Sequence, residues 1–258
     1  MKHIDELKDV SNVNLVVFDV DGVIVPRGSK VIEEGNMVTY DLKFPSKKFI
    51  NFVRELLEYT NVAISSGRSM LTLKTMFSEL LGEERNGNLF LMQAENGGRI
   101  SCGVDEIGAG HDPANMRKLM LLRPKLRSIN HENKIGFEPK ETILTLHCKD
   151  RVPEVEELLK NSDHYIYWNN EAYDMGDPNI TKGTGLERIK SYLEEKFGKP
   201  IKSIAIGDRP NDVEMLEKSD ISVSADSSYL KDTQYYVDEA EDLPGVILAE
   251  KLLELYRE

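Results

Sequence analysis

Nine residues near the N-terminus carry most of the information about the fold: Leu15-Val16-Val17-Phe18-Asp19-Val20-Asp21-Gly22-Val23. A short apolar run of this kind is typical of a buried strand in a parallel sheet. The run ends in two carboxylates, and a buried carboxylate needs a metal, a cationic partner or solvent. Ligands bind at the carboxyl ends of the strands in open α/β sheets. Asp19 and Asp21 are therefore expected to form a site rather than to pack.

Strand and helix patterns alternate on both sides of this stretch. Further short strands are expected at residues 61–65, 89–93, 203–206, 221–223 and 235–237. Apolar stripes with helical spacing follow Ser46 and Ser69, and another such stripe ends at Gly198. This alternation predicts an α/β fold with a doubly wound parallel sheet and right-handed crossovers.

The middle of the chain has a different pattern. A helix is expected at 113–129, long strands within 134–149, a helix at 152–159 and a strand at 165–169. This order predicts an α+β module at residues 97–176, inserted into a core made of residues 1–96 and 177–258. Residues 30–33 and 37–42 flank a Glu34-Gly35-Asn36 turn and are expected to form a β-hairpin.

Composition and charge exclude several classes of protein. The 258 residues are 40% hydrophobic and 30% charged, which is ordinary for a folded chain. The net charge of −12 argues against a protein that grips nucleic acid, and an anionic substrate would need a local cation. No apolar stretch approaches the roughly 18–20 residues that span a bilayer, and no apolar signal core follows Met1. We therefore expect no membrane partner and a cytoplasmic location.

Four loops that carry carboxylate, hydroxyl or ammonium side chains lie at the expected carboxyl ends of strands. They are Asp19-Val20-Asp21-Gly22, Ser65-Ser66-Gly67-Arg68, Thr181-Lys182-Gly183 and Gly207-Asp208-Arg209-Pro210-Asn211-Asp212. The second loop joins a hydroxyl to a helix start, which suits an oxyanion. Taken singly, each loop could be an ordinary turn or helix N-terminus. All four in this order on one sheet indicate an active site.

With these loops the chain resembles the haloacid dehalogenase-like hydrolase superfamily, whose four motifs they match in order. The module at 97–176 is similar to the α/β cap of the branch in which the cap follows the third core strand. That branch includes Cof-type proteins, sugar-phosphate phosphatases, phosphoglycolate phosphatases and phosphomannomutases. The resemblance implies a Rossmann-like core with an inserted α+β cap domain. The hairpin at 30–42 resembles the flap of capless relatives, which would place it at the pocket rim.

The resemblance also implies roles for the loop residues. Asp19 would attack phosphorus to form an aspartyl-phosphate, and Asp21 would act as general acid and then general base. The phosphoryl oxygens would be held by Ser66, the Gly67 N–H, Lys182 and Asn211. Mg²⁺ would bind Asp19, the Asp21 carbonyl and Asp208, with Asp212 as a ligand or support, because Mg²⁺ prefers oxygen ligands.

The implied function is hydrolysis of a small phosphorylated metabolite, either a sugar phosphate or a phosphoglycolate-type or phosphoglycerate-type ester. The alternatives are a phosphosugar mutase and a non-catalytic phosphosugar-binding protein; the intact pair of Asp19 and Asp21 argues against the second. Dehalogenases of the superfamily lack the equivalent of Asp21. The expected partner is a small phosphate ester, with no nucleic acid, and the protein is expected to be a monomer or homodimer.

The cap is expected to recognise the organic part of the substrate. The candidates are Glu95, Asn96 and Gly97, where the chain crosses from core to cap, together with Trp168 and Asn169. Arg123, Arg127 and Tyr173 are further candidates for side chains that point into the cleft. The sequence does not identify the physiological substrate.

Overall fold

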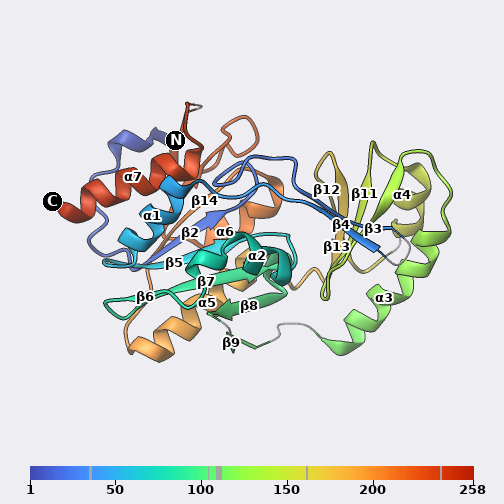
Figure 1. Ribbon diagram of the computed structural model, residues 1–258, viewed down its shortest axis with the longest axis horizontal. Coiled ribbons are helices and arrows are strands. Elements are labelled where there is room, and N and C mark those ends of the chain that lie inside the picture. The colour runs from blue at the N-terminus through green and yellow to red at the C-terminus, as the bar shows by residue number, and fades with distance from the viewer. Residues whose placement is uncertain (35–36, 104, 109–111, 161, 239) are drawn as a thin grey trace.

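The computed structural model describes residues 1–34, 37–103, 105–108, 112–160, 162–238 and 240–258. Its strands form a larger and a smaller sheet that lie beside one another (Figure 1). Both termini belong to the part that contains the larger sheet. The α/β fold with a second sheet agrees with the sequence-based prediction.

The larger sheet is mostly parallel. Its order is β1-β16-β15-β14-β2-β5-β7-β8-β9, and β6 pairs with β7. The strands are β1 (Lys2–His3), β2 (Leu15–Asp19), β5 (Asn61–Ser65), β6 (Glu84–Arg85), β7 (Asn88–Ala94), β8 (Arg99–Cys102), β9 (Asp105–Glu106), β14 (Ser203–Gly207), β15 (Ile221–Ser224) and β16 (Tyr235–Tyr236). The strand β2 lies between β14 and β5, so the stretch at residues 15–23 occupies the middle of the sheet.

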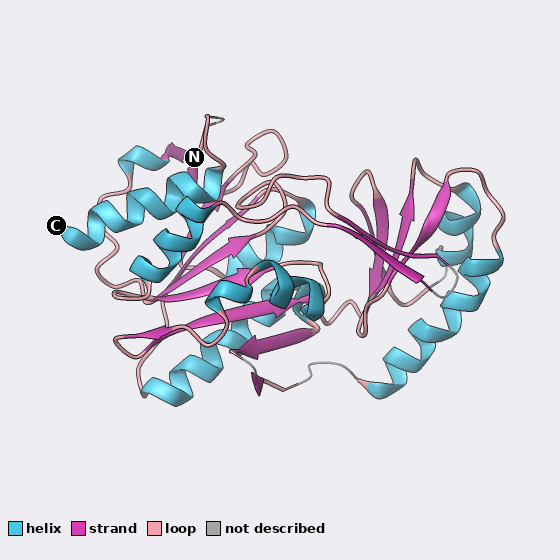
Figure 2. Cartoon of the chain, viewed as in Figure 1, coloured by secondary structure: helices cyan, strands magenta, loops and turns pink. Residues whose placement is uncertain are grey.

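Helices cover both faces of this sheet (Figure 2). The first face packs against α1 (Lys47–Leu56), α2 (Met70–Met76) and α7 (Pro244–Arg257), and the second against α5 (Lys182–Phe197) and α6 (Val213–Lys218). Side chains alternate along a strand, so Phe18 faces the first layer and Val17 the second. The 3-10 turns are η1 (Ile4–Glu6), η2 (Ser78–Leu80), η3 (Glu95–Gly97) and η4 (Pro210–Asp212). None of the described helices has the length and apolar character that crossing a membrane requires.

The smaller sheet is antiparallel, in the order β12-β13-β11-β10-β3-β4. Its strands are β3 (Lys30–Glu34), β4 (Met37–Asp41), β10 (Lys134–Glu138), β11 (Leu144–Cys148), β12 (Tyr165–Trp168) and β13 (Ala172–Gly176). Apolar residues on one of its faces pack against α3 (Pro113–Ser128) and α4 (Pro153–Leu159). The other face of the smaller sheet is not covered by these helices and can face the larger sheet.

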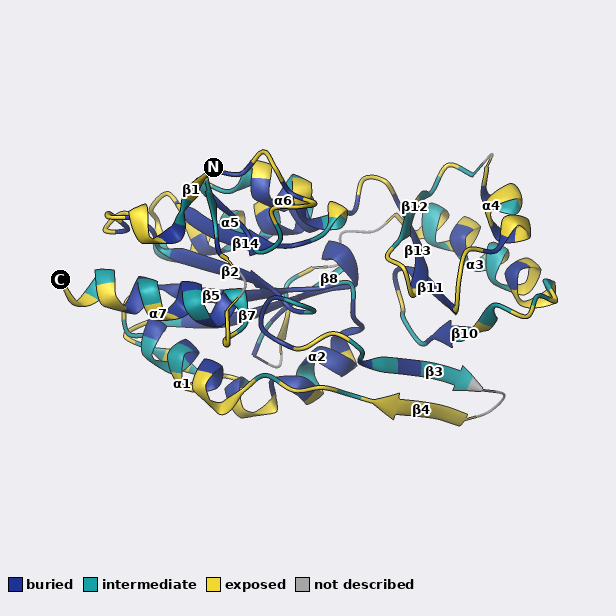
Figure 3. Cartoon of the chain, turned by 90° about the horizontal axis from the view of Figure 1, so that it is seen from above, coloured by how far each residue is buried: buried dark blue, intermediate teal, exposed yellow. Residues whose placement is uncertain are grey.

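Strand pairing differs from the expected boundaries in two places. The strand β8 pairs with β7, so the larger sheet continues past residue 97. The hairpin strand β3 pairs with β10, so residues from the expected core segment 1–96 belong to the smaller sheet. Figure 3 shows both strands of the hairpin beside the smaller sheet, with β4 exposed. The expected turn residues 35–36 lie outside the described part of the chain. With these two changes, the division into core and cap remains our proposal.

The hairpin also accounts for two of the arginines expected in the cleft. Arg123 and Arg127 of α3 are both ion-paired with Glu33 of β3, and Arg127 Nη2 lies 2.6 Å from Glu33 Oε1. The guanidinium of Arg123 lies 5.1 Å from the centre of the Phe137 ring. These arginines therefore attach the hairpin to α3 and do not line the cleft.

Candidate active site

The four loops meet at the carboxyl end of the larger sheet and line one cavity of about 220 Å³. Among its lining residues are the predicted Asp19, Asp21, Ser66, Gly67, Lys182, Asp208 and Asn211. The smaller sheet forms the other side of this cavity, and from it come Trp168 and Asn169. Such a volume lies a little below the usual range for ligand pockets, about 300–1,000 Å³, and so suits a small molecule.

Lys182 joins two carboxylates at the base of the cavity. Its Nζ lies 2.5 Å from Asp19 Oδ1 and 2.6 Å from Asp212 Oδ1, and only 1% of the residue is exposed. Burial opposes the charged form of Lys182, but the two carboxylates outweigh it and raise the pKa of Lys182 above its ordinary value. Burial and the charge of Asp212 raise the pKa of Asp19, against the effect of Lys182. One ammonium group thus serves two buried acids.

The sequence around Lys182 explains its position. Thr181 is the N-cap of α5 and forms a reciprocal capping box with Thr184, so Lys182 begins the helix. Gly183 packs against Glu214, where a Cβ would lie 2.5 Å from Glu214 Cγ. The cap at Thr181 fixes the start of α5, and Gly183 lets this start pack closely against Glu214. Lys182 is therefore directed toward the end of β2.

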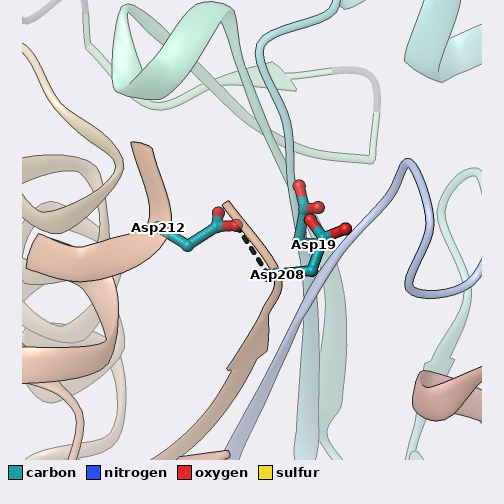
Figure 4. A group of neighbouring side chains, drawn as sticks. All are labelled: Asp19, Asp208 and Asp212. Carbon is teal, nitrogen blue, oxygen red and sulfur yellow. Dashed lines mark hydrogen bonds between the residues drawn. The ribbon is translucent and has the colours of Figure 1, made fainter. Parts of the chain in front are cut away.

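Asp212 holds the fourth loop, and Asp208 faces the cavity. Oδ2 of Asp212 accepts hydrogen bonds from the backbone N–H groups of Asp208 and Arg209, both at 3.0 Å; Figure 4 shows the first of these bonds. Asp19, Asp208 and Asp212 each offer an oxygen within 4.8 Å of the others. Oδ1 of Asp208 is buried and has no hydrogen-bond partner among the residues that the structure describes. A buried oxygen without a partner in an all-oxygen cluster fits a hard cation such as Mg²⁺.

Asp21 is held apart from this cluster by Arg68. Nε and Nη2 of Arg68 lie 2.7 and 2.6 Å from the two oxygens of Asp21, and Nη2 also donates to the Ser29 carbonyl at 3.3 Å. Burial opposes the charge of Arg68, but Asp21 outweighs it and raises the pKa of Arg68. Arg68 was not among the predicted site residues, although it follows Gly67 directly in the second loop.

Asn96 links the second and fourth loops. Its backbone N–H donates to the Ser66 carbonyl at 3.0 Å, and its Oδ1 accepts from Asn211 Nδ2 at 3.2 Å. Glu95 points elsewhere, since its Oε2 accepts from the backbone N–H of Glu141 at 3.0 Å and from the hydroxyl of Thr142 at 2.7 Å. The structure thus places Asn96 next to the phosphate-binding candidates, whereas Glu95 fastens the smaller sheet to the larger part.

Sequence reasoning missed a polar row on the smaller sheet. Alternation in β11 turns Leu144 and Leu146 toward α3 and α4, and turns the residues between them toward the cavity. The row consists of Glu138, Lys140, Thr145, His147 and Asp174, which all line the cavity. Lys140 Nζ lies 2.7 Å from the Thr145 hydroxyl, 3.4 Å from Glu138 and 3.6 Å from Asp174. The alternating pattern at 144–148 was the signal that could have identified Thr145 and His147.

Gly97 was expected where the chain crosses to the cap, but it lies in the turn between β7 and β8 of the larger sheet, against the third loop. Its φ is +101°, and a Cβ there would collide with the carbonyl oxygen of Thr181. We expect Gly97→Ala to lower the free energy of unfolding by about 2–4 kcal/mol, through backbone strain and overpacking. We also expect it to lower kcat, because Thr181 positions Lys182.

Gly198→Ala is the matched control for Gly97→Ala, because Gly198 has φ +65° but nothing within 4 Å of an added Cβ. Its cost should be about 1–2 kcal/mol, from backbone conformation alone. Urea denaturation and phosphate-release kinetics measure both effects. Equal costs for the two variants would contradict the packing argument.

Known proteins resemble this chain in sequence and in fold. A family model of haloacid dehalogenase-like hydrolases matches residues 107–231. Over this segment, just under half of its length, the chain is similar to the haloacid dehalogenase-like hydrolases. A phosphoglycolate phosphatase of Haloarcula marismortui is 28% identical over 166 residues, which cover 60% of this chain and 66% of the relative.

Solved structures share the fold of this chain. The C-terminal domain of the C. albicans trehalose-6-phosphate phosphatase has a TM-score of 0.66 at 16% identity, covering 95% of this chain and 92% of that domain. A superfamily phosphatase from Bacteroides thetaiotaomicron has a TM-score of 0.65 at 16% identity, covering 95% and 96%. The likeness therefore extends over both sheets.

Proposed function

We propose that this hydrolase is a Mg²⁺-dependent phosphomonoesterase that acts on a small phosphorylated metabolite through an aspartyl-phosphate. The observation that carries the proposal is the position of Asp19. It ends the central strand, is ion-paired with Lys182 and lies in a cavity with Ser66, Gly67 and Asp208. A carboxylate nucleophile beside a fixed cation and oxyanion donors is the arrangement that phosphoryl transfer requires.

The proposed reaction uses each predicted residue in turn. A carboxylate oxygen of Asp19 forms a bond to phosphorus while the bond from phosphorus to the ester oxygen breaks. Asp21 gives a proton to that leaving oxygen and then takes one from the attacking water. The water oxygen bonds to phosphorus, which releases inorganic phosphate and restores Asp19. Lys182 and the N–H of Gly67 hold the phosphoryl oxygens during both steps.

The residues fit a Mg²⁺ ion, as the buried Oδ1 of Asp208 without a partner indicates. We assign the side chains of Asp19 and Asp208 and the carbonyl of Asp21 as its ligands. Asp212 supports this site, since Lys182 and two backbone N–H groups already occupy its oxygens. The ion would supply positive charge that lowers the repulsion between Asp19 and the phosphate.

The organic part of the substrate would contact the smaller sheet. The polar row holds Glu138, Lys140 and Asp174 within one network, and Trp168 and Asn169 line the same cavity. Hydroxyl-rich and carboxylate-bearing esters both find partners in such a row. The named relatives act on phosphoglycolate and trehalose 6-phosphate, and we propose a substrate within that range of small phosphate esters.

The test is phosphate release from p-nitrophenyl phosphate with and without metal. We expect release in Mg²⁺, a loss of at least about 100-fold in EDTA, and recovery when excess Mg²⁺ is added, because charge stabilisation at one site contributes several kcal/mol. Full activity in EDTA would contradict the metal assignment. A screen of sugar phosphates and phosphoglycolate then ranks substrates, and isomerisation of a sugar phosphate without release of phosphate would indicate a mutase.

A further inference from the structure

Arg27 contacts the proposed metal site although it belongs to none of the four loops. It follows the Asp21 loop along the chain and lines the cavity. Its Nη2 is ion-paired with Oδ2 of Asp208. Burial opposes the charged form of Arg27, but the carboxylate of Asp208 outweighs it and raises the pKa of Arg27. A full positive charge therefore lies on an oxygen next to the buried Oδ1 without a partner.

The glycine of the first loop makes this contact possible. Gly22 has φ +87°, and a Cβ at this position would lie 2.8 Å from Arg27 Nε and 2.8 Å from Asp208 Oδ2. Any side chain at residue 22 would therefore separate Arg27 from Asp208. The ion pair between Arg27 and Asp208 therefore packs directly against the backbone of Gly22.

A second arginine near Asp208 is anchored differently. Arg209 Nη1 lies 4.0 Å from Asp208 Oδ2, but it is bound to Asp226 at 2.9 Å, and its guanidinium lies 4.2 Å from the centre of the Tyr229 ring. Arg27 has Asp208 as its one ion-pair partner within the described ranges, and 40% of its side chain is exposed. Of the two arginines, Arg27 is the one that loses its partner if Asp208 binds something else.

We propose that Arg27 and the divalent cation compete for Asp208, and that a bound cation redirects Arg27 to the phosphate group of the substrate. The inference rests on the function proposed above. A divalent cation on Asp208 would repel the guanidinium with twice the force of a single charge. A phosphate group brings negative charge into the same cavity, and its oxygens match the fork of donors on a guanidinium.

This competition has a thermodynamic consequence. Without phosphate, Arg27 must give up Asp208 before the cation gains it, so the ion pair lowers the affinity for Mg²⁺. With phosphate present, Arg27 has another partner and that cost disappears. Mg²⁺ and phosphate should therefore strengthen each other's binding, by the same factor in each direction.

Isothermal titration calorimetry of the whole chain tests the proposal without any measurement of turnover. We expect Arg27→Met to lower the Kd for Mg²⁺ at least fivefold in the absence of phosphate. In saturating Mg²⁺, the same variant should raise the Kd for inorganic phosphate at least tenfold. An arginine that merely stabilised the loops would weaken both ligands, so the opposite signs are the decisive result.

The controls separate this inference from the proposed function. Arg85→Met removes the same charge beside Asn88 at the amino end of β7, and should change the Kd for Mg²⁺ less than twofold. Arg27→Gln repeats the test with a polar side chain in case Arg27→Met does not fold. Unchanged or weaker Mg²⁺ binding in both Arg27 variants overturns the competition alone. Absence of Mg²⁺ binding in the wild-type protein overturns the proposed function and this inference with it.

Discussion

Asp19→Asn should reduce phosphate release from p-nitrophenyl phosphate by at least about 10⁴-fold, which is the scale of loss when a covalent nucleophile is removed. The amide has nearly the shape of the carboxylate but lacks its negative charge and is a poor nucleophile toward phosphorus. Lys182 keeps its other partner, Asp212, at 2.6 Å, so the variant should remain folded. The loss is therefore expected in kcat, with the thermal unfolding midpoint close to that of the wild type.

Asp163→Asn is the matched control for Asp19→Asn. It makes the same chemical change on a side chain that is 88% exposed and lies between α4 and β12, and kcat should stay within twofold of the wild type. Residual turnover of Asp19→Asn within tenfold of the wild type would contradict the assignment of the nucleophile. In that case another oxygen of the cluster, such as Asp208, would have to attack.

The residues of the four loops could be predicted because each follows from a local rule. Asp19 ends an apolar strand, Thr181 caps the helix that Lys182 begins, and Pro210 starts the turn that carries Asp212. Parallel strands bring such ends to one edge of a sheet whatever their separation in sequence. The position of the site therefore depends on the parallel direction of the strands, which the alternation of strands and helices predicts.

Partners of side chains could not be predicted, because they depend on register and on contacts between loops. Arg68 binds Asp21, which lies 47 residues earlier in the chain. Asp174 joins the polar row because β13 pairs with β11 so that Asp174 lies opposite Thr145. The strand β3 enters the smaller sheet through a pairing of Glu33 with Phe137. None of these three contacts has a signature within its own segment.

The largest expected effect on stability belongs to Lys182→Met. The substitution keeps the volume of the side chain and leaves Asp19 and Asp212 buried without their shared cation. Removal of one partner from a buried ion pair costs about 3–5 kcal/mol, and we expect a fall of that size in the free energy of unfolding at neutral pH. Loss of a donor to the phosphoryl oxygens should also lower kcat by about 10²–10³-fold.

Lys190→Met is the matched control, because Lys190 belongs to the same helix and is paired with Asp220 at 2.9 Å in a more exposed position. Its cost should stay below about 1 kcal/mol. Urea denaturation of Lys182→Met, Lys190→Met and wild type in EDTA gives the comparison. Equal costs for the two variants would contradict the account of Lys182 as the shared cation of two acids.

The pH and metal dependence of Lys182→Met provide the sharper test. Burial and Asp212 already raise the pKa of Asp19 above its unfolded value, and Lys182 opposes them. A carboxyl group with a raised folded pKa destabilises the protein at high pH, and protonation removes that penalty as the pH falls through the folded pKa. The deficit of Lys182→Met relative to wild type should therefore shrink as the pH is lowered from alkaline values through the folded pKa of Asp19. Mg²⁺ should raise the unfolding midpoint of the variant more than that of the wild type, because the ion replaces part of the missing charge. A deficit that does not change with pH would mean that lost packing, and not uncompensated carboxylate charge, destabilises the variant.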